Sequence, residues 1–299
     1  MGVPAAVRRL RARLQRPLAY DESWEPAGER VPSFGSPISQ ACTYAQIRDA
    51  AYARWCTNLR VPLLCHRKQW EWCYIAQVLA GAGMNEPGRR GLGFGVGTEP
   101  IVAYLASTGS TIVATDLAAD ASGAQRWAET GQHATAVAEL NRDRLCPDDS
   151  FRELVTFRPI DMNAVPDDLT GFDFTWSSCA LEHLGNLGAG VDFFLRQIDC
   201  LRPGGVGVHT TEYNVSSNAA TVSKGHTVLY RRRDIEELAS EVARRGHAMD
   251  VTFGLGTAPE DRHIDRHPWS NTHLKIESGG HVVTSLGLIV TKASEARAS

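Results

Sequence analysis

A few polar residues in the second half of the chain have side chains that can bind a metal ion or move a proton. Glu182 and His183 are adjacent, and His209, Glu212 and His226 follow further along. Carboxylates suit hard divalent ions such as Mg²⁺, and imidazoles act as general bases near neutral pH. Each histidine also has a plain structural interpretation: a helix-start residue at 183, a packed strand residue at 209 and a surface loop residue at 226. Which of the two interpretations holds for each histidine depends on the strands and helices that position it.

A glycine-dense stretch, GLGFGVG from Gly91 to Gly97, lies upstream of these residues and is followed by Pro100 and an apolar segment. Glycines permit positive φ and let the backbone approach a bulky ligand, and proline suits the first position of a helix. A β-branched run then ends on Asp116, where an acid can accept hydrogen bonds from a ribose diol. The order of strand, glycine turn, helix and strand predicts the nucleoside-binding half of an α/β sheet.

The spacing of Gly93, Gly95 and Gly97 separates two kinds of nucleoside ligand. The dinucleotide fingerprint is G-x-G-x-x-G, and here the third glycine falls one residue early. Glu99 places a negative charge where a pyrophosphate would lie, but a ligand with an ammonium group and no phosphate tolerates it. At these residues the chain resembles the class I S-adenosylmethionine (SAM) dependent methyltransferases, whose first motif has the form G-x-G-x-G. Many members carry an acid two residues before the first motif glycine, where this chain has Gly91.

Later segments extend this resemblance. Residues 151–160 are predicted as a third strand that ends on Asp161, where the resemblance implies an acid that accepts a hydrogen bond from the adenine amino group. Residues 172–177 predict a fourth strand, and a helix, a Pro-Gly-Gly break and a fifth strand at 206–211 follow. The expected fold class is α/β, a Rossmann-like seven-stranded methyltransferase sheet with a helical N-terminal extension. The expected cofactor is SAM, and the expected cofactor-binding residues are Gly93, Gly95, Gly97, Asp116, Asp161, Met162 and Ser177.

Residues 1–87 are expected to form an N-terminal arm and a helical lid, and residues 88–299 the SAM-binding methyltransferase domain. The arm begins with an arginine-rich stretch and continues as an extended connector over residues 21–40. Helical periodicity follows over residues 43–60 and 66–82. The polar residues that begin the second helix lie beside tryptophans, and they fit either an amphipathic surface or contacts with the substrate or the cofactor carboxylate.

The remaining elements are placed by pattern. A helix is expected over residues 121–140, with Trp127 either in the core or near the adenine. Strands six and seven are expected at residues 248–253 and 281–292. The polar loop between them, residues 257–273, is expected to help close over the substrate, because long insertions are often functional.

The segment after the fourth strand resembles a second motif. In the ubiquinone-pathway O-methyltransferases and the eukaryotic small-RNA 2′-O-methyltransferases, E-x-x-E-H binds a divalent ion here, and this chain has C-A-L-E-H with Cys179 replacing the first acid. A Glu-Tyr-Asn stretch at residues 212–214 and the later histidine also match the small-RNA enzymes. The resemblance implies a metal site, with Mg²⁺ as the candidate ion, formed by Glu182, His183 and His226. The expected catalytic residues are His183, His209 and Glu212.

An alcohol is a poor nucleophile unless a base or a metal assists it, and a metal that binds adjacent hydroxyls implies a vicinal diol. We therefore expect O-methylation of a sugar or saccharide hydroxyl by an enzyme of the bacterial, actinobacterial kind. The first alternative is a metal-independent natural-product O- or N-methyltransferase with His183 or His209 as its base. The second alternative is a non-catalytic SAM-binding module.

Composition limits the partners. The formal net charge of −3 argues against a nucleic-acid binder, and no apolar run approaches the roughly 18 residues that a membrane span needs. The seven scattered cysteines include no C-x-x-C pair, which indicates reduced thiols in a cytoplasmic protein. The expected partner is a small-molecule or oligosaccharide substrate, and a homo-oligomer is left open.

Overall fold

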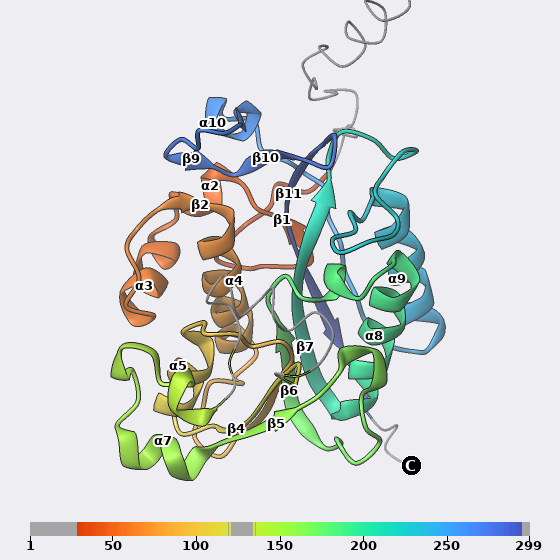
Figure 1. The fold of residues 1–299 in the computed structure, drawn as a ribbon. Coiled ribbons are helices and arrows are strands. Elements are labelled where there is room, and N and C mark those ends of the chain that lie inside the picture. Colours follow the sequence, from red (N-terminus) through yellow and green to blue (C-terminus); the bar gives the residue numbers. More distant parts are fainter. Residues whose placement is uncertain (1–28, 119, 121–133, 135, 295–299) are drawn as a thin grey trace, which may run out of the picture.

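The structure is a computed structural model, and it describes residues 29–118, 120, 134 and 136–294. A central β-sheet carries helices on both faces, which confirms the expected α/β, Rossmann-like fold class (Figure 1). The strands are β1 (Gln40–Ala41), β2 (Cys65–His66), β3 (Arg90–Gly93), β4 (Thr111–Asp116), β5 (Val155–Pro159), β6 (Phe172–Ser177), β7 (Leu201–Asn214), β8 (Ile264–Asp265), β9 (Thr272–His273), β10 (Lys275–Ser278) and β11 (His281–Thr291). The α-helices are α2 (Tyr44–Ile47), α3 (Ala50–Asn58), α4 (Arg67–Gly81), α5 (Ile101–Ser107), α7 (Asp148–Leu154), α8 (Leu187–Cys200), α9 (Arg232–Arg244) and α10 (Pro259–Arg262).

The main sheet has the strand order β5-β4-β3-β6-β7-β11-β10-β8, with β1 also paired to β11. Strands β3 to β7 are mutually parallel, and β11 runs antiparallel to β7. The described residues thus give this sheet nine strands where seven are expected. Because the parallel strands end at one edge, the residues that follow β3, β4, β5 and β6 come together there.

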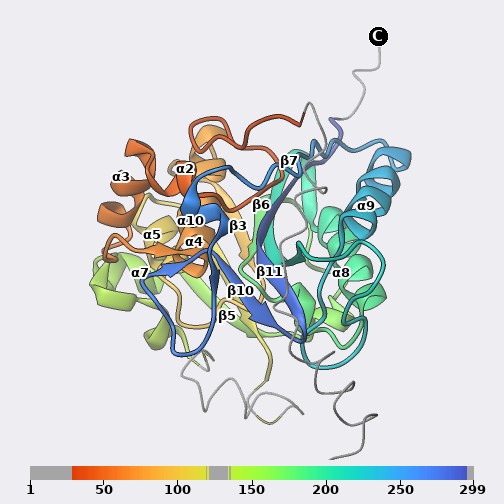
Figure 2. The same ribbon diagram turned by 90° about the horizontal axis from the view of Figure 1, so that it is seen from above.

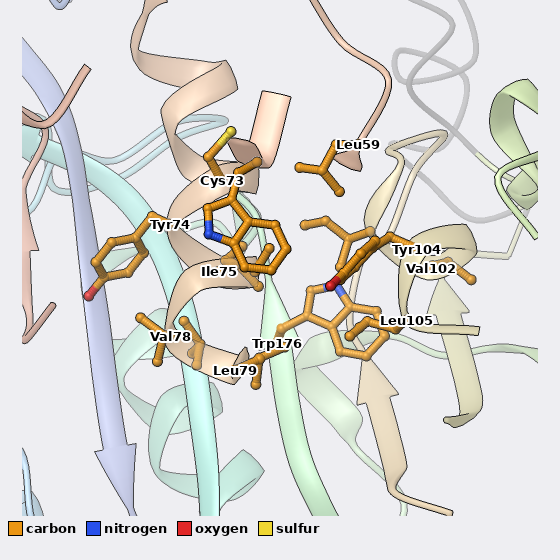
Figure 3. Packing of buried hydrophobic residues seen from close by; sticks show 14 of the residues in the cluster. Leu59, Cys73, Tyr74, Ile75, Val78, Leu79, Val102, Tyr104, Leu105 and Trp176 are labelled. Carbon is orange, nitrogen blue, oxygen red and sulfur yellow. The ribbon is translucent and has the colours of Figure 1, made fainter. Parts of the chain in front are cut away.

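Helices cover the two faces of the sheet unequally. Figures 1 and 2 show α3, α4, α5 and α7 on one side and α8 and α9 on the other. On the first side, α4 and α5 bury aromatic and aliphatic side chains against Trp176 of β6, and Leu59 beyond α3 joins them (Figure 3). On the second side, α8 buries Phe193 and Phe194 against the sheet. Strand β6 alternates apolar and polar residues: Phe174 and Trp176 pack on the first side, and the hydroxyl of Thr175 donates to Gln197 of α8 on the second.

Most of the predicted elements are confirmed. Residues 172–177 form β6, and the predicted helix over residues 66–82 is α4. The helical pattern over residues 43–60 is interrupted at Asp49, whose carboxylate accepts a hydrogen bond from the Ala51 amide at 2.7 Å. That interaction caps the first turn of α3 and so divides the pattern into α2 and α3.

Two predicted strands are wrong in part. Residues 148–154 form α7, so the strand predicted over residues 151–160 begins only at Val155. Two aspartates in the first turn stabilise that helix through its dipole. Residues 248–253 form only isolated bridges, and β10 pairs with β11 instead through a tight turn at Gly279 and Gly280. Both glycines have positive φ, +56° and +76°, which the turn requires.

The described part of the N-terminal segment packs into the sheet itself. Strand β1 pairs with β11, and the ring of Tyr74 from α4 lies so close to Gly287 that a Cβ there would meet it at 2.1 Å. The expected loop over residues 257–273 contains α10 and β8. The division at residue 87 stays a prediction, as does the lid. The arginine-rich arm at residues 1–28 lies outside the described residues, as does Trp127. Of the helix predicted over residues 121–140, residues 121–133 and 135 also lie outside them, and Val137–Leu140 form a short 3₁₀ helix.

The missing acid at Gly91 has a physical explanation. A Cβ on this residue would lie 2.3 Å from the Phe174 ring and 3.0 Å from the Ile112 side chain. The ring of Phe174 therefore occupies the space that a side chain at position 91 would need.

None of the helices in the described part of the chain is long and apolar enough to cross a membrane.

We predict that Gly91→Ala lowers the free energy of unfolding by about 1–3 kcal/mol, because the new methyl group overpacks the core. Chemical denaturation measures the change. Gly81→Ala is the matched control, since a Cβ there meets no atom within 4 Å in α4. In a Phe174→Leu background, Gly91→Ala should lower the free energy of unfolding by a smaller amount. An equal decrease in the wild-type and Phe174→Leu backgrounds would contradict this explanation.

Candidate functional site

One cavity of about 1040 Å³ lies at the carboxyl edge of the parallel strands. Its wall includes the glycine turn after β3, the ends of β4 and β5, the segment after β6 and the first turns of α4. The cavity brings together eight of the sequence-predicted site residues: Gly95, Gly97, Asp116, Asp161, Met162, His183, Glu212 and His226. Gly93, Ser177, Glu182 and His209 are not part of its lining.

The glycine turn has the geometry that a close ligand needs. Gly95 and Gly97 have φ of +55° and +50°, which only glycine adopts without strain. A Cβ on Gly95 would lie 3.1 Å from the Ala180 side chain and 3.5 Å from the sulfur of Met162. The backbone amides of Gly97 and Leu117 donate to the Asp116 carboxylate at 3.1 and 2.8 Å. The turn and the acid at the end of β4 therefore form one rigid unit.

Asp161 and Met162 follow β5 on the same wall. The Asp161 carboxylate accepts a hydrogen bond from the Asn163 amide at 2.8 Å, which starts a short 3₁₀ turn over Met162–Ala164. Met162 is buried under the glycine turn and Asp161 is exposed. This places a carboxylate and an apolar side chain together beside the turn, a surface that suits a planar base with an exocyclic amine.

Helix α4 contributes a buried charge network that borders the cavity. Arg67 donates to Glu212 at 2.8 Å, and the Lys68 ammonium lies 3.2 Å from the same carboxylate. Glu71 is fully buried and accepts from Thr210 at 2.8 Å, Ser178 at 3.2 Å and the hydroxyl of Ser285. Although burial alone would raise it, the charges of Arg67 and Lys68 hold the pKa of Glu212 below its usual range.

A second group of polar side chains lies at the start of the turn after β6. Glu182 is buried, and its Oε1 lies 3.9 Å from Nε2 of His183. Nδ1 of His183 lies 2.8 Å from the backbone oxygen of His226, so it donates there as an N–H. The His226 ring is exposed and packs edge-on against His183, with centroids 5.0 Å apart. Glu182, His183 and His226 are therefore neighbours, and their role as metal ligands stays a prediction.

The tightest cluster of possible metal ligands in the described chain has a different membership. One donor atom each from Cys179, Glu182 and Glu212 lies within 4.8 Å of the others. Oε1 of Glu182 and Oε2 of Glu212 are buried and accept no hydrogen bond from the described residues. Buried carboxylate oxygens without a partner are costly, so these donors fit a bound cation.

His209 and Ser177 lie outside the cavity lining, and their catalytic and cofactor-binding roles stay predictions. His209 is fully buried, with its ring between Phe193 and Phe194 of α8 and Nδ1 2.8 Å from the Ser177 hydroxyl. Burial lowers the pKa of His209 to about 3. With its ring packed between these phenylalanines, His209 gains no support from the geometry as a base for an acceptor in the cavity.

Several lining residues were missed in the sequence or only partly recognised. Lys68 and Trp72 of α4 line the cavity, as do Ser178 and Arg142. The indole of Trp72 and the hydroxyl of Ser178 hydrogen-bond to Glu99. For α4, the sequence signal was the cluster of polar residues beside tryptophans at the start of the helix. One of its two interpretations, contact with the substrate or the cofactor carboxylate, agrees with the position of Lys68 and Trp72 in the cavity lining. No local pattern marked Arg142 or Ser178.

Comparison with models of known protein families gave no match, and neither did comparison with curated proteins. Solved structures do show similarity. Magnesium protoporphyrin IX methyltransferase from Synechocystis PCC 6803 is 11% identical, with a TM-score of 0.47 over 81% of this chain and 93% of that chain. The methyltransferase domain of a bacterial Hen1 protein is 13% identical, with a TM-score of 0.46 over 76% of this chain and 100% of that chain.

A third similar structure is the 1,6-didemethyltoxoflavin-N1-methyltransferase of Burkholderia thailandensis. It is 15% identical, with a TM-score of 0.42 over 84% of this chain and 82% of that chain. Because all three TM-scores lie below 0.5, the fold assignment rests on the strand order of this chain itself.

We predict that Arg67→Met lowers the free energy of unfolding by about 3–5 kcal/mol, since it leaves the buried Glu212 short of a partner. Urea denaturation measures this. Arg152→Met is the control, because Arg152 pairs with Asp149 at an exposed site, and it should change stability by less than about 1 kcal/mol. Adding Glu212→Gln to Arg67→Met should restore part of the loss. Similar decreases in the free energy of unfolding for Arg67→Met and Arg152→Met would contradict a buried ion pair at Arg67.

The pH dependence of stability should carry a signature of Glu99. Burial first, and the nearby charge of Glu71, raise the pKa of Glu99 from 4.5 to about 8. Between these values the folded protein keeps a proton that the unfolded chain releases, so stability falls as pH rises from about 5 to 8. Glu99→Gln should remove up to about 1.4 kcal/mol per pH unit of that slope.

Denaturation curves at several pH values, without added ligand, measure the slope. The exposed substitution Glu153→Gln is the control and should leave the slope unchanged. If Glu99→Gln and the wild-type protein show parallel pH profiles, Glu99 does not hold that proton.

Proposed function

We propose that this chain is a SAM-dependent methyltransferase that methylates a hydroxyl of a sugar or saccharide with the help of a divalent metal ion. One observation carries the proposal: a single cavity joins the glycine turn and Asp116 to the polar cluster that follows β6. The first part has the shape and polarity for a nucleoside, and the second has groups that can activate a nucleophile. A pure binding module has no need of the second part.

The residues around the turn fit SAM better than a dinucleotide. Asp116 and Asp161 line this part of the cavity, and a pyrophosphate would be repelled there. SAM carries an ammonium and a sulfonium group and no phosphate. In this proposal Asp116 accepts from the ribose, Asp161 from the adenine amine, and Met162 packs on the base. Glu99 faces the ammonium group, and Gly95 and Gly97 allow the backbone to approach the cofactor.

Methyl transfer from a sulfonium is an in-line displacement, so the protein has to orient the acceptor and help remove its proton. Glu182 and His183, with His226 beside them, would hold the divalent ion, and the orphaned Oε1 of Glu182 fits that use. When bound, such an ion supplies Lewis acidity to a coordinated hydroxyl. Glu212, held by Arg67 and Lys68, keeps its charge at the cavity wall and can orient a hydroxyl.

The alternative is a metal-independent natural-product O- or N-methyltransferase with a histidine base. His183 is the candidate, because its Nδ1 donates to the backbone oxygen of His226 and so fixes the ring with Nε2 as the acceptor. His209 does not support this alternative, since it lies among the phenylalanines of α8.

The test is release of S-adenosylhomocysteine from SAM with a panel of mono- and disaccharides, with and without Mg²⁺. We expect turnover that excess EDTA reduces. Asp116→Asn should weaken SAM binding by about 10-fold or more, since it removes a charged hydrogen-bond acceptor. The control is Asp149→Asn on the exposed face of α7, which should bind SAM normally.

Full turnover in EDTA, with Glu182→Ala and His226→Ala both active, would rule out the metal. Turnover of amines but of no saccharide would favour the alternative. Failure to bind SAM would overturn the proposal as a whole.

A further inference from the structure

The cluster of Cys179, Glu182 and Glu212 differs in chemistry from the all-oxygen and imidazole set expected for Mg²⁺. Resting on the proposed function for its place in the cavity, we propose that these three residues form a thiolate–carboxylate site. This site shares Glu182 with the ligand set of the proposed function and replaces it as the place of the single ion. It binds a thiophilic divalent ion, of which Zn²⁺ and Co²⁺ are examples, in preference to Mg²⁺.

The geometry converges from three elements. Cys179 follows β6, Glu182 lies in the 3₁₀ turn Leu181–His183, and Glu212 is near the end of β7. Their donor atoms lie within 4.8 Å of one another, and Sγ of Cys179 is 4.0 Å from Oε1 of Glu212. One ion at the centre of such a group reaches all three donors with small side-chain movements. Cys179 and Glu212 line the cavity, so the site is open to ligands from that side.

A second observation points to a cation at this place. Each carboxylate is held by one oxygen: Oε2 of Glu182 accepts from Thr211 at 3.2 Å, and Oε1 of Glu212 accepts from Arg67 at 2.8 Å. The other oxygen of each is buried without a hydrogen-bond partner in the described chain. Glu182 is 0% exposed and Glu212 is 7% exposed, so bulk water does not compensate. A bound cation satisfies both oxygens at once.

The charges around the cluster are compatible with a divalent ion. Arg67 and Lys68 pair with Glu71 and Glu212. Without a metal, Cys179 is a thiol that donates to Glu71 at 3.1 Å. On binding, a divalent ion would displace that proton to solvent and would neutralise the thiolate together with the Glu182 carboxylate. A bound substrate hydroxyl without a metal ion would not neutralise this negative charge.

The thiol decides which ion is preferred. Mg²⁺ requires oxygen ligands, whereas thiolate sulfur favours zinc-like ions. The Cys179 backbone has φ of +45°, a conformation that non-glycine residues rarely adopt, and its amide donates to Thr210 at 3.0 Å. The turn thus directs the thiol toward Glu212 and Glu71 rather than toward solvent.

The experiment is a Co²⁺ titration of the full-length protein without SAM or acceptor, following the sulfur-to-cobalt charge-transfer absorption. We expect a saturable band that Zn²⁺ removes and a large excess of Mg²⁺ does not. Cys179→Ser should abolish the band, and Glu212→Gln should weaken binding by about 10- to 100-fold. Cys200→Ser is the matched control, because Cys200 is a buried thiol on α8 outside the cavity, and it should keep the band.

Cys179→Asp supplies a second readout, since it converts the site to oxygen ligands: thermal stabilisation by Mg²⁺ should appear in this variant. Absence of the band in a folded wild-type protein, or its persistence in Cys179→Ser, would overturn the inference. Because the titration uses neither SAM nor acceptor, this failure is distinct from failure to bind SAM or to release S-adenosylhomocysteine.

Discussion

The burial of Arg67 and Glu71 against the sheet is the constraint on which the rest of this structure depends. Charged groups are stable in a protein interior only when partners satisfy them, and these two reach Glu212, Ser285, Thr210 and each other. The partners lie on β7 and β11, so α4 has one position in which its charges are paired. The same network holds Glu212 at the cavity wall, and a helix from the N-terminal segment thereby becomes part of the site.

The alternation of side chains along β7 divides the chemistry of that strand. Thr210 and Glu212 face α4, where they bond to Glu71 and Arg67, whereas His209 faces α8. Residues that differ by an odd number on a strand point to opposite faces, so His209 and Glu212 leave β7 on different sides of the sheet. The two-residue period of the strand therefore explains why Glu212 lines the cavity while His209 packs among the phenylalanines of α8.

Local sequence patterns predicted most of the helices and strands, but they did not predict which distant segments pair with one another. Residues 172–177 carry a buried strand pattern with a clear break behind it, and the structure has that strand with the same bounds. The strand predicted at 248–253 is reduced to isolated bridges, because β10 and β1 pair with most of that edge of β11 and leave Ala248 a single bridge to Thr291. The partners of Arg67 and Glu71 were beyond prediction, since 145 residues separate Arg67 from Glu212 and 214 separate Glu71 from Ser285.

The charges that line the cavity favour a cationic ligand over a phosphate-bearing one. Its lining has four carboxylates, Glu99, Asp116, Asp161 and Glu212, and two strong bases, Lys68 and Arg142. Lys68 already pairs with Glu212, and Arg142 lies 3.6 Å from Asp143. Around the glycine turn the acids therefore outnumber the bases, which is the reverse of what a pyrophosphate needs. Burial raises the pKa of Glu99 to about 8, and a bound ammonium group would lower that pKa again and favour the charged carboxylate.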